Sequence, residues 1–137
     1  MPAVEIDGEP WFDGAFGPTG GIPIDAAQQD GFDRFLVIMT RTRMYRKSAA
    51  GRATWLLRHT HKQFPALLES MKDRHIRYNE TRDYLFELER QGKAYLFIPE
   101  FMKINNQDRN PVKLSLAYQE GLAQARREMP AIREFLG

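Results

Sequence analysis

The longest uninterrupted apolar run in the chain covers residues 35–39 and has the sequence Phe35-Leu36-Val37-Ile38-Met39. Val and Ile inside a short, continuous apolar run are typical of a strand that is buried on both faces, as in a parallel sheet. The run is far shorter than the roughly 20 residues that a membrane-spanning helix needs. We therefore expect a parallel sheet built around residues 35–39.

The residues before this run predict the other parts of the same sheet. Ala3–Ile6 alternates apolar and acidic residues, and the turn residues Asp7-Gly8 lead into a short strand at Trp11-Phe12. A glycine-rich loop follows, and then a short helix that starts at Pro23 and ends before Gly31. Strand, loop, helix and strand make a βαβ unit, whose two strands are parallel and joined by a right-handed crossover.

After this unit the sequence changes to the periodicity of helices, in which apolar residues recur every three or four positions. A first helix is expected around Trp55–Leu57, and Pro65 interrupts it or starts a new one. The long helix that follows is expected to end at Gly92, which is a good stop signal. Tyr95–Ile98 then predicts one further strand.

The last part of the chain is predicted to be helical. Asn110-Pro111 is a cap followed by a favourable first residue, so a helix is expected from there to about Glu128, with Pro130 starting a final short helix. The predicted fold class is therefore α/β: a partial three-layer sheet with a parallel βαβ unit, followed by a helix-rich region with one further strand. We expect these two parts to cover residues 1–47 and residues 48–137.

Length and composition fit an ordinary folded protein, because the 137 residues include 42% hydrophobic and 28% charged residues. The chain has no cysteine, which excludes disulfides, thiolate-ligated zinc and a cysteine nucleophile. The N-terminus has no charged start followed by an apolar stretch, so no signal peptide is recognised. We expect a cytoplasmic protein.

The net charge of +2 hides an uneven distribution of charge along the chain. Residues 1–33 hold seven acids and no Lys or Arg, whereas residues 41–62 hold seven basic residues and no acid. One interpretation is that the two stretches pair with each other in the fold. A total charge close to zero does not fit a dedicated nucleic-acid footprint, so no nucleic-acid partner is expected.

Asp13 has the most informative chemical context. It follows the expected strand at Trp11-Phe12 and precedes the glycine-rich loop, which places it at the carboxyl edge of an open α/β sheet, where ligands bind. Arg41 and Arg43 follow the next strand, so a parallel arrangement brings them to the same edge. One acid and two guanidinium groups there suit general-base catalysis or anion recognition. The alternative is an aspartate that caps its own turn or pairs with Arg41.

Other kinds of site find little support in the sequence. The loop at residues 14–21 has neither the ending of a P-loop nor the spacing of a dinucleotide fingerprint. His59 and His61 are two positions apart, so on a helix they point in different directions and cannot share one metal ion. We therefore expect no metal site and no cofactor. The only serines are Ser48, Ser70 and Ser115. None of them lies in a G-x-S-x-G motif, so the chain has no recognisable acyl-transfer nucleophile.

Several segments, taken together, are typical of one protein family. The first ones are Trp11-Phe12-Asp13-Gly14-Ala15, Gly21-Ile22-Pro23-Ile24 and Gly31-Phe32-Asp33, the last of which leads into the apolar run and Thr40-Arg41. Later ones are Tyr45-Arg46-Lys47, Arg74-His75, Tyr78-Asn79-Glu80-Thr81, Gly92-Lys93-Ala94 and Ile98-Pro99-Glu100. With them the chain resembles the C-terminal part of a patatin-like phospholipase of the bacterial group with a helical extension. Residues 1–47 would then end the patatin-like α/β domain, and residues 48–137 would form the helix-rich C-terminal extension.

This resemblance implies hydrolysis of acyl esters by a Ser–Asp dyad. In the family the serine stands on a G-x-S-x-G turn, a glycine-rich segment supplies the oxyanion hole, and the aspartate of a D-G-[GA] motif acts as the base. Asp13 and Gly14 match that motif, so Asp13 is expected to be the dyad base. The serine turn and the oxyanion segment lie upstream in the family. We therefore expect this chain to be the C-terminal portion of a larger lipid acyl hydrolase, inactive by itself.

An alternative function follows from the basic stretch. The chain would then be a non-catalytic interaction module that binds anionic lipid or another acidic partner through residues 41–62, with Arg41, Arg43 and Arg46 as the anion-binding residues. The first function implies a lipid or other ester as substrate and contact with a membrane surface. The apolar run at residues 35–39 also predicts a homodimer, because a strand that lacks a sheet neighbour or a covering helix recruits a second copy.

Overall fold

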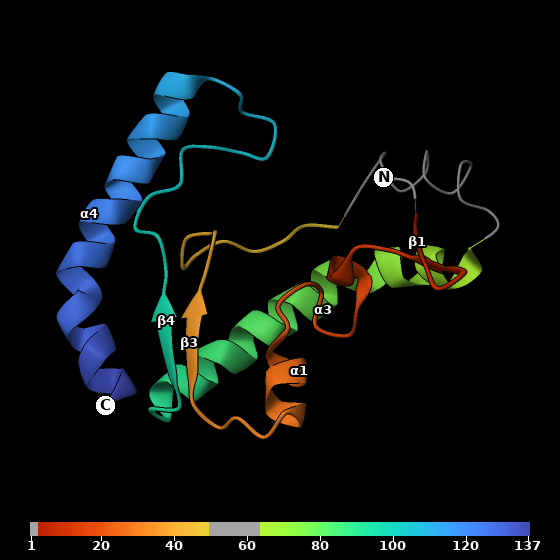
Figure 1. The fold of residues 1–137 in the computed structure, drawn as a ribbon, viewed down its shortest axis with the longest axis horizontal. Helices are drawn as coiled ribbons and strands as arrows, with labels where there is room; N and C mark the ends of the chain where they lie inside the picture. The colour runs from red at the N-terminus through yellow and green to blue at the C-terminus, as the bar shows by residue number, and fades with distance from the viewer. Residues whose placement is uncertain (1–2, 50–63) are drawn as a thin grey trace. The chain divides into compact units, whose positions relative to one another are not determined.

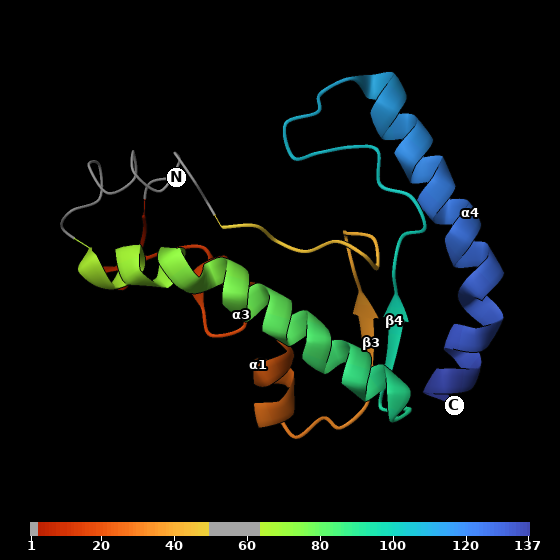
Figure 2. The same ribbon diagram turned by 180° about the vertical axis from the view of Figure 1, so that it is seen from behind.

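The computed structural model describes residues 3–49 and 64–137 (Figures 1 and 2). It is a mixed α/β structure with two small sheets, which confirms the predicted fold class. The chain divides into two compact units. Unit 1 consists of Met1–Phe32 and Arg46–Tyr84, and unit 2 of Asp33–Tyr45 and Leu85–Gly137. The expected boundary between residues 47 and 48 stays a prediction, and the helix expected around Trp55–Leu57 lies outside the described residues.

Unit 1 begins with an antiparallel hairpin. Strand β1 (Val4–Ile6) pairs with β2 (Glu9–Trp11), with Val4 opposite Trp11. The turn residues Asp7 and Gly8 have φ angles of 52° and 80°, which is the left-handed conformation that tight two-residue hairpin turns require. The Asp7-Gly8 turn predicted from the sequence is confirmed, and its effect is to return the chain directly onto β1.

The described segments that follow the hairpin in unit 1 contact one long helix. Two short helical segments follow the hairpin, η1 (Gly14–Phe16) and α1 (Ile24–Gln29), and both lie beside α3 (Pro65–Arg90) in the two views of Figures 1 and 2. Gln28 Nε2 donates a hydrogen bond to Tyr84 Oη at 2.6 Å, which links α1 to α3. Pro65 starts α3, and Gly92, with a φ of 70°, follows its end, as the sequence predicts.

Unit 2 is built on a parallel pair of strands. Strand β3 (Phe35–Ile38) pairs in parallel with β4 (Ala94–Phe97), with Phe35 opposite Ala94, and the last part of α3, from Leu85 on, belongs to the same unit. The apolar run therefore forms a strand of a parallel pair, as predicted, but the prediction that Trp11-Phe12 is a parallel strand of the same sheet is wrong. Strand β2 pairs with β1 in the hairpin, and the neighbour of β3 comes from a segment far along the chain.

The apolar core of unit 2 gathers residues from both strands and from the helices around them. Each member is less than a tenth exposed: Phe35, Met39, Leu85, Leu88, Ala94, Leu96, Ile98 and Ile132. The other face of β3 is open, because Leu36 is 38% and Ile38 is 70% exposed. The prediction that this strand is buried on both faces is therefore wrong for the described residues. The expected homodimer stays a prediction.

The C-terminal helix α4 (Pro111–Leu136) packs beside β4. Asn110 caps it as predicted, since its Oδ1 accepts hydrogen bonds from the backbone N of Val112 and Lys113. The predicted end near Glu128 is wrong, because the helix continues through Pro130 to Leu136. A proline removes one backbone hydrogen bond of the helix. Burial of Ile132, beyond the proline, gives the last turn a packing partner that the local sequence pattern does not reveal.

Candidate functional site

Asp13 lies two residues after Trp11, the last residue of β2, and caps η1. Its Oδ1 accepts a hydrogen bond from Ala15 N at 2.8 Å, and its backbone carbonyl accepts one from Phe16 N at 3.1 Å. Asp13 and Gly14 are both exposed. The turn cap that the sequence left open as an alternative is thus present. Within the described part of the chain this cap is the one hydrogen bond of the carboxylate, so Oδ2 has no partner there.

A small open hollow of about 310 Å³ lies beside this carboxylate. Besides Asp13, its lining consists of Gly14, Ala15, Gly17, Pro18, Thr19, Gly21, Pro23 and Asp25. Glycine lets a ligand approach the backbone closely, because it has no side chain in the way. The volume is near the lower end of the range for small-molecule sites, about 300–1,000 Å³.

Helix α3 supports the loop that follows Asp13. Ser70 Oγ donates a hydrogen bond to the backbone carbonyl of Phe16, and the Arg74 guanidinium lies 5.6 Å from the centre of the Phe16 ring. Gly20, with a φ of 67°, approaches Tyr78 so closely that a Cβ at this position would lie 2.6 Å from Tyr78 N. Ser70, Arg74 and Tyr78 are four residues apart, so they share one face of the helix.

Two of the candidate anion-binding arginines are ion-paired with acids of α3. Arg43 donates to both carboxylate oxygens of Glu89, at 2.8 and 2.9 Å. Arg46 donates to Asp83 Oδ1 at 2.6 Å and to the Asn79 carbonyl at 3.3 Å. These hydrogen bonds raise the pKa of both guanidinium groups and lower the pKa of Asp83. The partners of these arginines therefore include acids outside the N-terminal acidic stretch.

The third candidate, Arg41, has weaker contacts. Its guanidinium lies 5.1 Å from the centre of the Tyr45 ring and donates to Asn106 Oδ1 at 3.4 Å. Arg41 and Arg43 belong to unit 2, whereas Asp13 belongs to unit 1 together with Arg46. The prediction that Asp13, Arg41 and Arg43 meet at one sheet edge stays a prediction. The strand pairing from which it was derived differs from the observed one.

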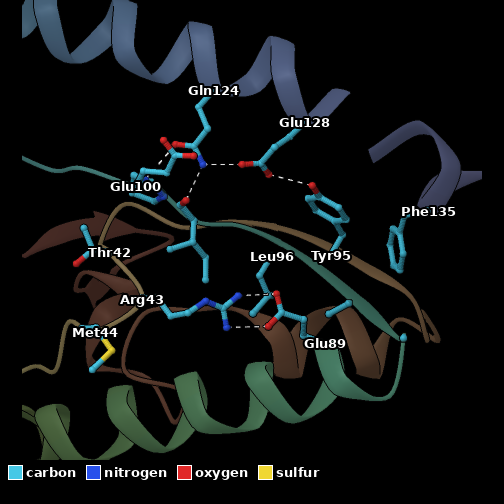
Figure 3. Close-up of a pocket in the computed structure, with 14 residues that line it drawn as sticks. Thr42, Arg43, Met44, Glu89, Tyr95, Leu96, Glu100, Gln124, Glu128 and Phe135 are labelled. Carbon is cyan, nitrogen blue, oxygen red and sulfur yellow. Dashed lines mark hydrogen bonds and ion pairs between the residues drawn. The ribbon is translucent and has the colours of Figure 1, made fainter. Parts of the chain in front are cut away.

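A larger hollow, of about 710 Å³, lies in unit 2 and contains a polar network that no sequence motif indicates (Figure 3). Tyr95 Oη donates to Glu128 Oε2 at 2.9 Å, and Gln124 Nε2 donates to Glu128 Oε1 at 2.7 Å. Gln124 Nε2 also donates to the Ile98 carbonyl at 2.7 Å, and its Oε1 accepts from Glu100 N at 3.1 Å. The only signal in the sequence is the spacing of Gln124 and Glu128, one helical turn apart.

This network connects α4 to β4. Burial, and then the hydrogen bond to Glu128, raise the pKa of Tyr95, so its hydroxyl stays protonated and acts as a donor at neutral pH. Gln124 is only 5% exposed and uses both ends of its amide. Since a buried amide is costly unless it is hydrogen-bonded, this arrangement fixes the position of α4 rather than offering an open reactive group.

Two searches of the described residues, one for metal-ligand clusters and one for membrane-spanning helices, found none. No group of three or more His, Asp or Glu side chains there could hold a metal ion. His75 Nδ1 lies 3.0 Å from the Lys72 carbonyl, and His59 and His61 lie outside the described residues. Among the described helices, none combines the length and the apolar character needed to cross a bilayer.

Comparison with known protein families finds a match for the C-terminal part of the chain. Residues 64–137 match the model of a family described as Domain of unknown function (DUF6363). The matched segment takes in α3, β4 and α4, and it does not include β3 or Asp13. No curated protein and no solved structure matches the chain.

Proposed function

The chain belongs to the DUF6363 family, and we propose that it is the C-terminal portion of a patatin-like serine acyl hydrolase. In this proposal the chain supplies the aspartate of a Ser–Asp dyad, with Asp13 as the base and Gly14 as the glycine of the motif. The serine comes from outside these 137 residues, since none of the serines in this sequence lies in a G-x-S-x-G turn. The substrate is a lipid or another carboxylic ester.

The observation that supports this proposal most strongly is the way in which Asp13 is held. A general base needs a fixed position and an oxygen that is within reach of its partner. The bond from Ala15 N fixes Oδ1, while Oδ2 has no partner among the described residues. An exposed carboxylate beside a glycine-lined hollow suits a base that accepts a proton from a serine hydroxyl as the serine attacks an ester carbonyl.

The matched family segment has a definite part in this proposal. It contributes Ser70, Arg74 and Tyr78 of α3, which support the loop behind Asp13. The helix-rich segment thereby acts as a support for the base. This assigns α3 a positioning role that is independent of any contact with substrate.

The alternative function, binding of anionic lipid through residues 41–62, has less support. Arg43 and Arg46 are ion-paired with Glu89 and Asp83, so a lipid phosphate would have to compete with these carboxylates. Three other basic residues of the stretch, Arg52, Arg58 and Lys62, lie outside the described residues.

The test uses the polypeptide encoded by the complete reading frame and a p-nitrophenyl ester as substrate. Asp13→Asn keeps the size of the side chain and removes the base, so kcat should fall by about 10³-fold or more. Asp25→Asn is the matched control, because Asp25 lines the same hollow and its carboxylate accepts from Thr19 Oγ1 at 3.5 Å. The control should keep an activity close to that of the wild type.

A second measurement addresses the origin of the serine. A fluorophosphonate probe, which labels activated serines, should label the complete polypeptide and leave residues 1–137 unlabelled. Full activity of the Asp13→Asn variant would contradict the role of Asp13. If residues 1–137 alone hydrolysed the ester, and if Asp13→Asn abolished this activity, the proposal that the serine comes from outside this segment would be contradicted.

A further inference from the structure

A third hollow, of about 570 Å³, opens in unit 2 where the two parallel strands end. Phe97 is the last residue of β4, and Met39 directly follows β3. Met39 N donates to the Phe97 carbonyl at 2.9 Å, and both residues line the hollow. In open α/β sheets, the carboxyl ends of parallel strands are the place where ligands bind.

The lining of this hollow is mainly apolar. One wall is a stripe of α4 with helical spacing: Leu114, Ala117, Tyr118 and Gly121. The other wall is the segment after β4, with Phe101, Met102 and Ile104. Tyr118 and Phe101 are each 66% exposed. Large apolar side chains that converge on a hollow of this size are typical of a site for an apolar ligand.

Cationic side chains stand at the rim of this apolar lining. Arg127 lines the hollow, and its Nη2 donates to both carboxylate oxygens of Glu100 at 2.9 Å. Lys103 Nζ lies 3.6 Å from Oε1 of Glu120, another lining residue. The side chains of Arg127 and Lys103 are 57% and 77% exposed. A ligand carboxylate has to compete with Glu100 and Glu120 for these two cations, and exposed ion pairs of this kind contribute little to stability.

We propose that this hollow binds a long-chain fatty acid. The acyl chain lies along the stripe of α4, and the carboxylate lies at the rim beside Lys103 and Arg127. The choice of a fatty acid rests on the proposed function, since hydrolysis of a lipid ester releases such an acid. The binding site itself is made only of residues of unit 2, and Asp13 belongs to unit 1.

The test is a fluorescence titration of the 137-residue chain with cis-parinaric acid, a fatty acid that fluoresces when it enters an apolar site. Saturable binding of one molecule per chain is expected. A Cβ added at Gly121 meets no atom within 4 Å, so Gly121→Leu fills open space in the hollow. Leu also has a higher helix propensity than Gly. This variant should therefore fold normally and bind at least about ten-fold more weakly.

Ser115→Leu is the matched control, because it adds the same side chain to an exposed position of α4 outside the lining. It should bind like the wild type. Wild-type affinity of Gly121→Leu, or the absence of saturable binding, would overturn the proposal. So would sedimentation showing a dimer that Gly121→Leu dissociates, because the occupant of the hollow would then be a second copy.

Competition identifies the head group. Palmitate should displace the probe better than hexadecanol or lysophosphatidylcholine. The Lys103→Gln variant should bind palmitate several-fold more weakly and should bind hexadecanol with unchanged affinity. Lys113→Gln is the control, because Lys113 lies 3.6 Å from Asp108, which is outside the lining, whereas Lys103 pairs with the lining residue Glu120. This control should leave palmitate binding unchanged. Preference for the lysolipid or the alcohol would overturn the assignment of a fatty acid.

The proposal of a fatty-acid site and the proposal of a Ser–Asp dyad can be overturned independently of each other. Asp13→Asn should bind cis-parinaric acid like the wild type. Absence of binding, together with loss of ester hydrolysis on Asp13→Asn in the complete polypeptide, would overturn the fatty-acid site alone. Binding that is abolished by Gly121→Leu, in a complete polypeptide that hydrolyses no ester, would overturn the hydrolase alone.

Discussion

The two units are stabilised by different kinds of contact. Of the nine buried hydrophobic residues among those described, eight belong to unit 2 and only Ile24 belongs to unit 1. In unit 1 the segments before α3 are held by single directional contacts, such as those from Ser70 to Phe16 and from Gln28 to Tyr84. Apolar burial is the larger source of stability in folded proteins, so the contacts of the described residues favour unit 2 as the more resistant part.

The difference bears on where the candidate chemistry lies. Asp13 stands in the unit whose described residues include a single buried hydrophobic side chain, on a loop held by hydrogen bonds and by one close approach of backbones. Such regions open more easily than a packed core, and functional loops are commonly drawn from them. A carboxylate held by directional contacts has a defined position, and the loss of a single contact is enough to displace it.

The largest effect is expected in the core of unit 2. Leu85 is fully buried, so Leu85→Ala leaves a cavity and should lower the free energy of unfolding by about 2–5 kcal/mol. Leu116→Ala removes the same atoms from a side chain that is 60% exposed, and should cost less than about 0.5 kcal/mol. Urea denaturation followed by circular dichroism measures both. Equal costs for the two variants would mean that unit 2 has no apolar core around Leu85.

A smaller effect is expected in unit 1, at the contact between its loop and α3. Gly20 and Gly8 both have positive φ, but only at Gly20 would a Cβ clash, at 2.6 Å from Tyr78 N. Gly8→Ala therefore measures the backbone strain alone. Gly20→Ala adds an overlap with backbone atoms, so it should lower the free energy of unfolding by about 1–3 kcal/mol more than Gly8→Ala does. The same urea titration compares the two, and equal costs would show that the loop is free to move off α3.

The contrast between the units also explains which parts of the fold follow from the sequence. Local signals were sufficient at Asp7-Gly8, Pro65 and Asn110, because a turn or a helix end depends on a few neighbouring residues. The partner of β3 was assigned wrongly, since an apolar run specifies burial but not the strand beside it. Successive side chains of a strand point to opposite faces, and this alternation explains why one face of β3 is open. Ile38 belongs to the run, yet its side chain points away from the core.

The candidate site was predictable to a smaller extent. The motif at Asp13-Gly14 singles out the aspartate, and its position after a strand is confirmed. The contacts of Ser70 and Gly20 join residues far apart in the sequence, and no local pattern encodes them. The hollow at the ends of β3 and β4 follows the rule that ligands bind at carboxyl edges. It could not be located before the correct strand pairing was known.

The smallest effect concerns the ion pair between Arg46 and Asp83 in unit 1. The hydrogen bond from Arg46 lowers the pKa of Asp83 below its ordinary value of 3.8. A carboxyl group that is harder to protonate in the folded state stabilises that state when it is ionised. The contribution is therefore fully present above the ordinary value, and it is lost as the pH falls through the lowered value. Since the two side chains are 52% and 58% exposed, salt should also weaken it.

Asp83→Asn measures this contribution directly. At neutral pH and low salt the variant should unfold at a slightly lower urea concentration than the wild type, and the gap should close in strong acid and in high salt. Asp73→Asn, which changes another exposed acid of α3, is the control for a general effect of removing a negative charge from the helix. If both variants lower the urea concentration at the midpoint of unfolding equally, the ion pair contributes nothing specific. The same holds if the difference in midpoint between Asp83→Asn and the wild type persists in acid. The stability of unit 1 would then owe nothing measurable to this ion pair.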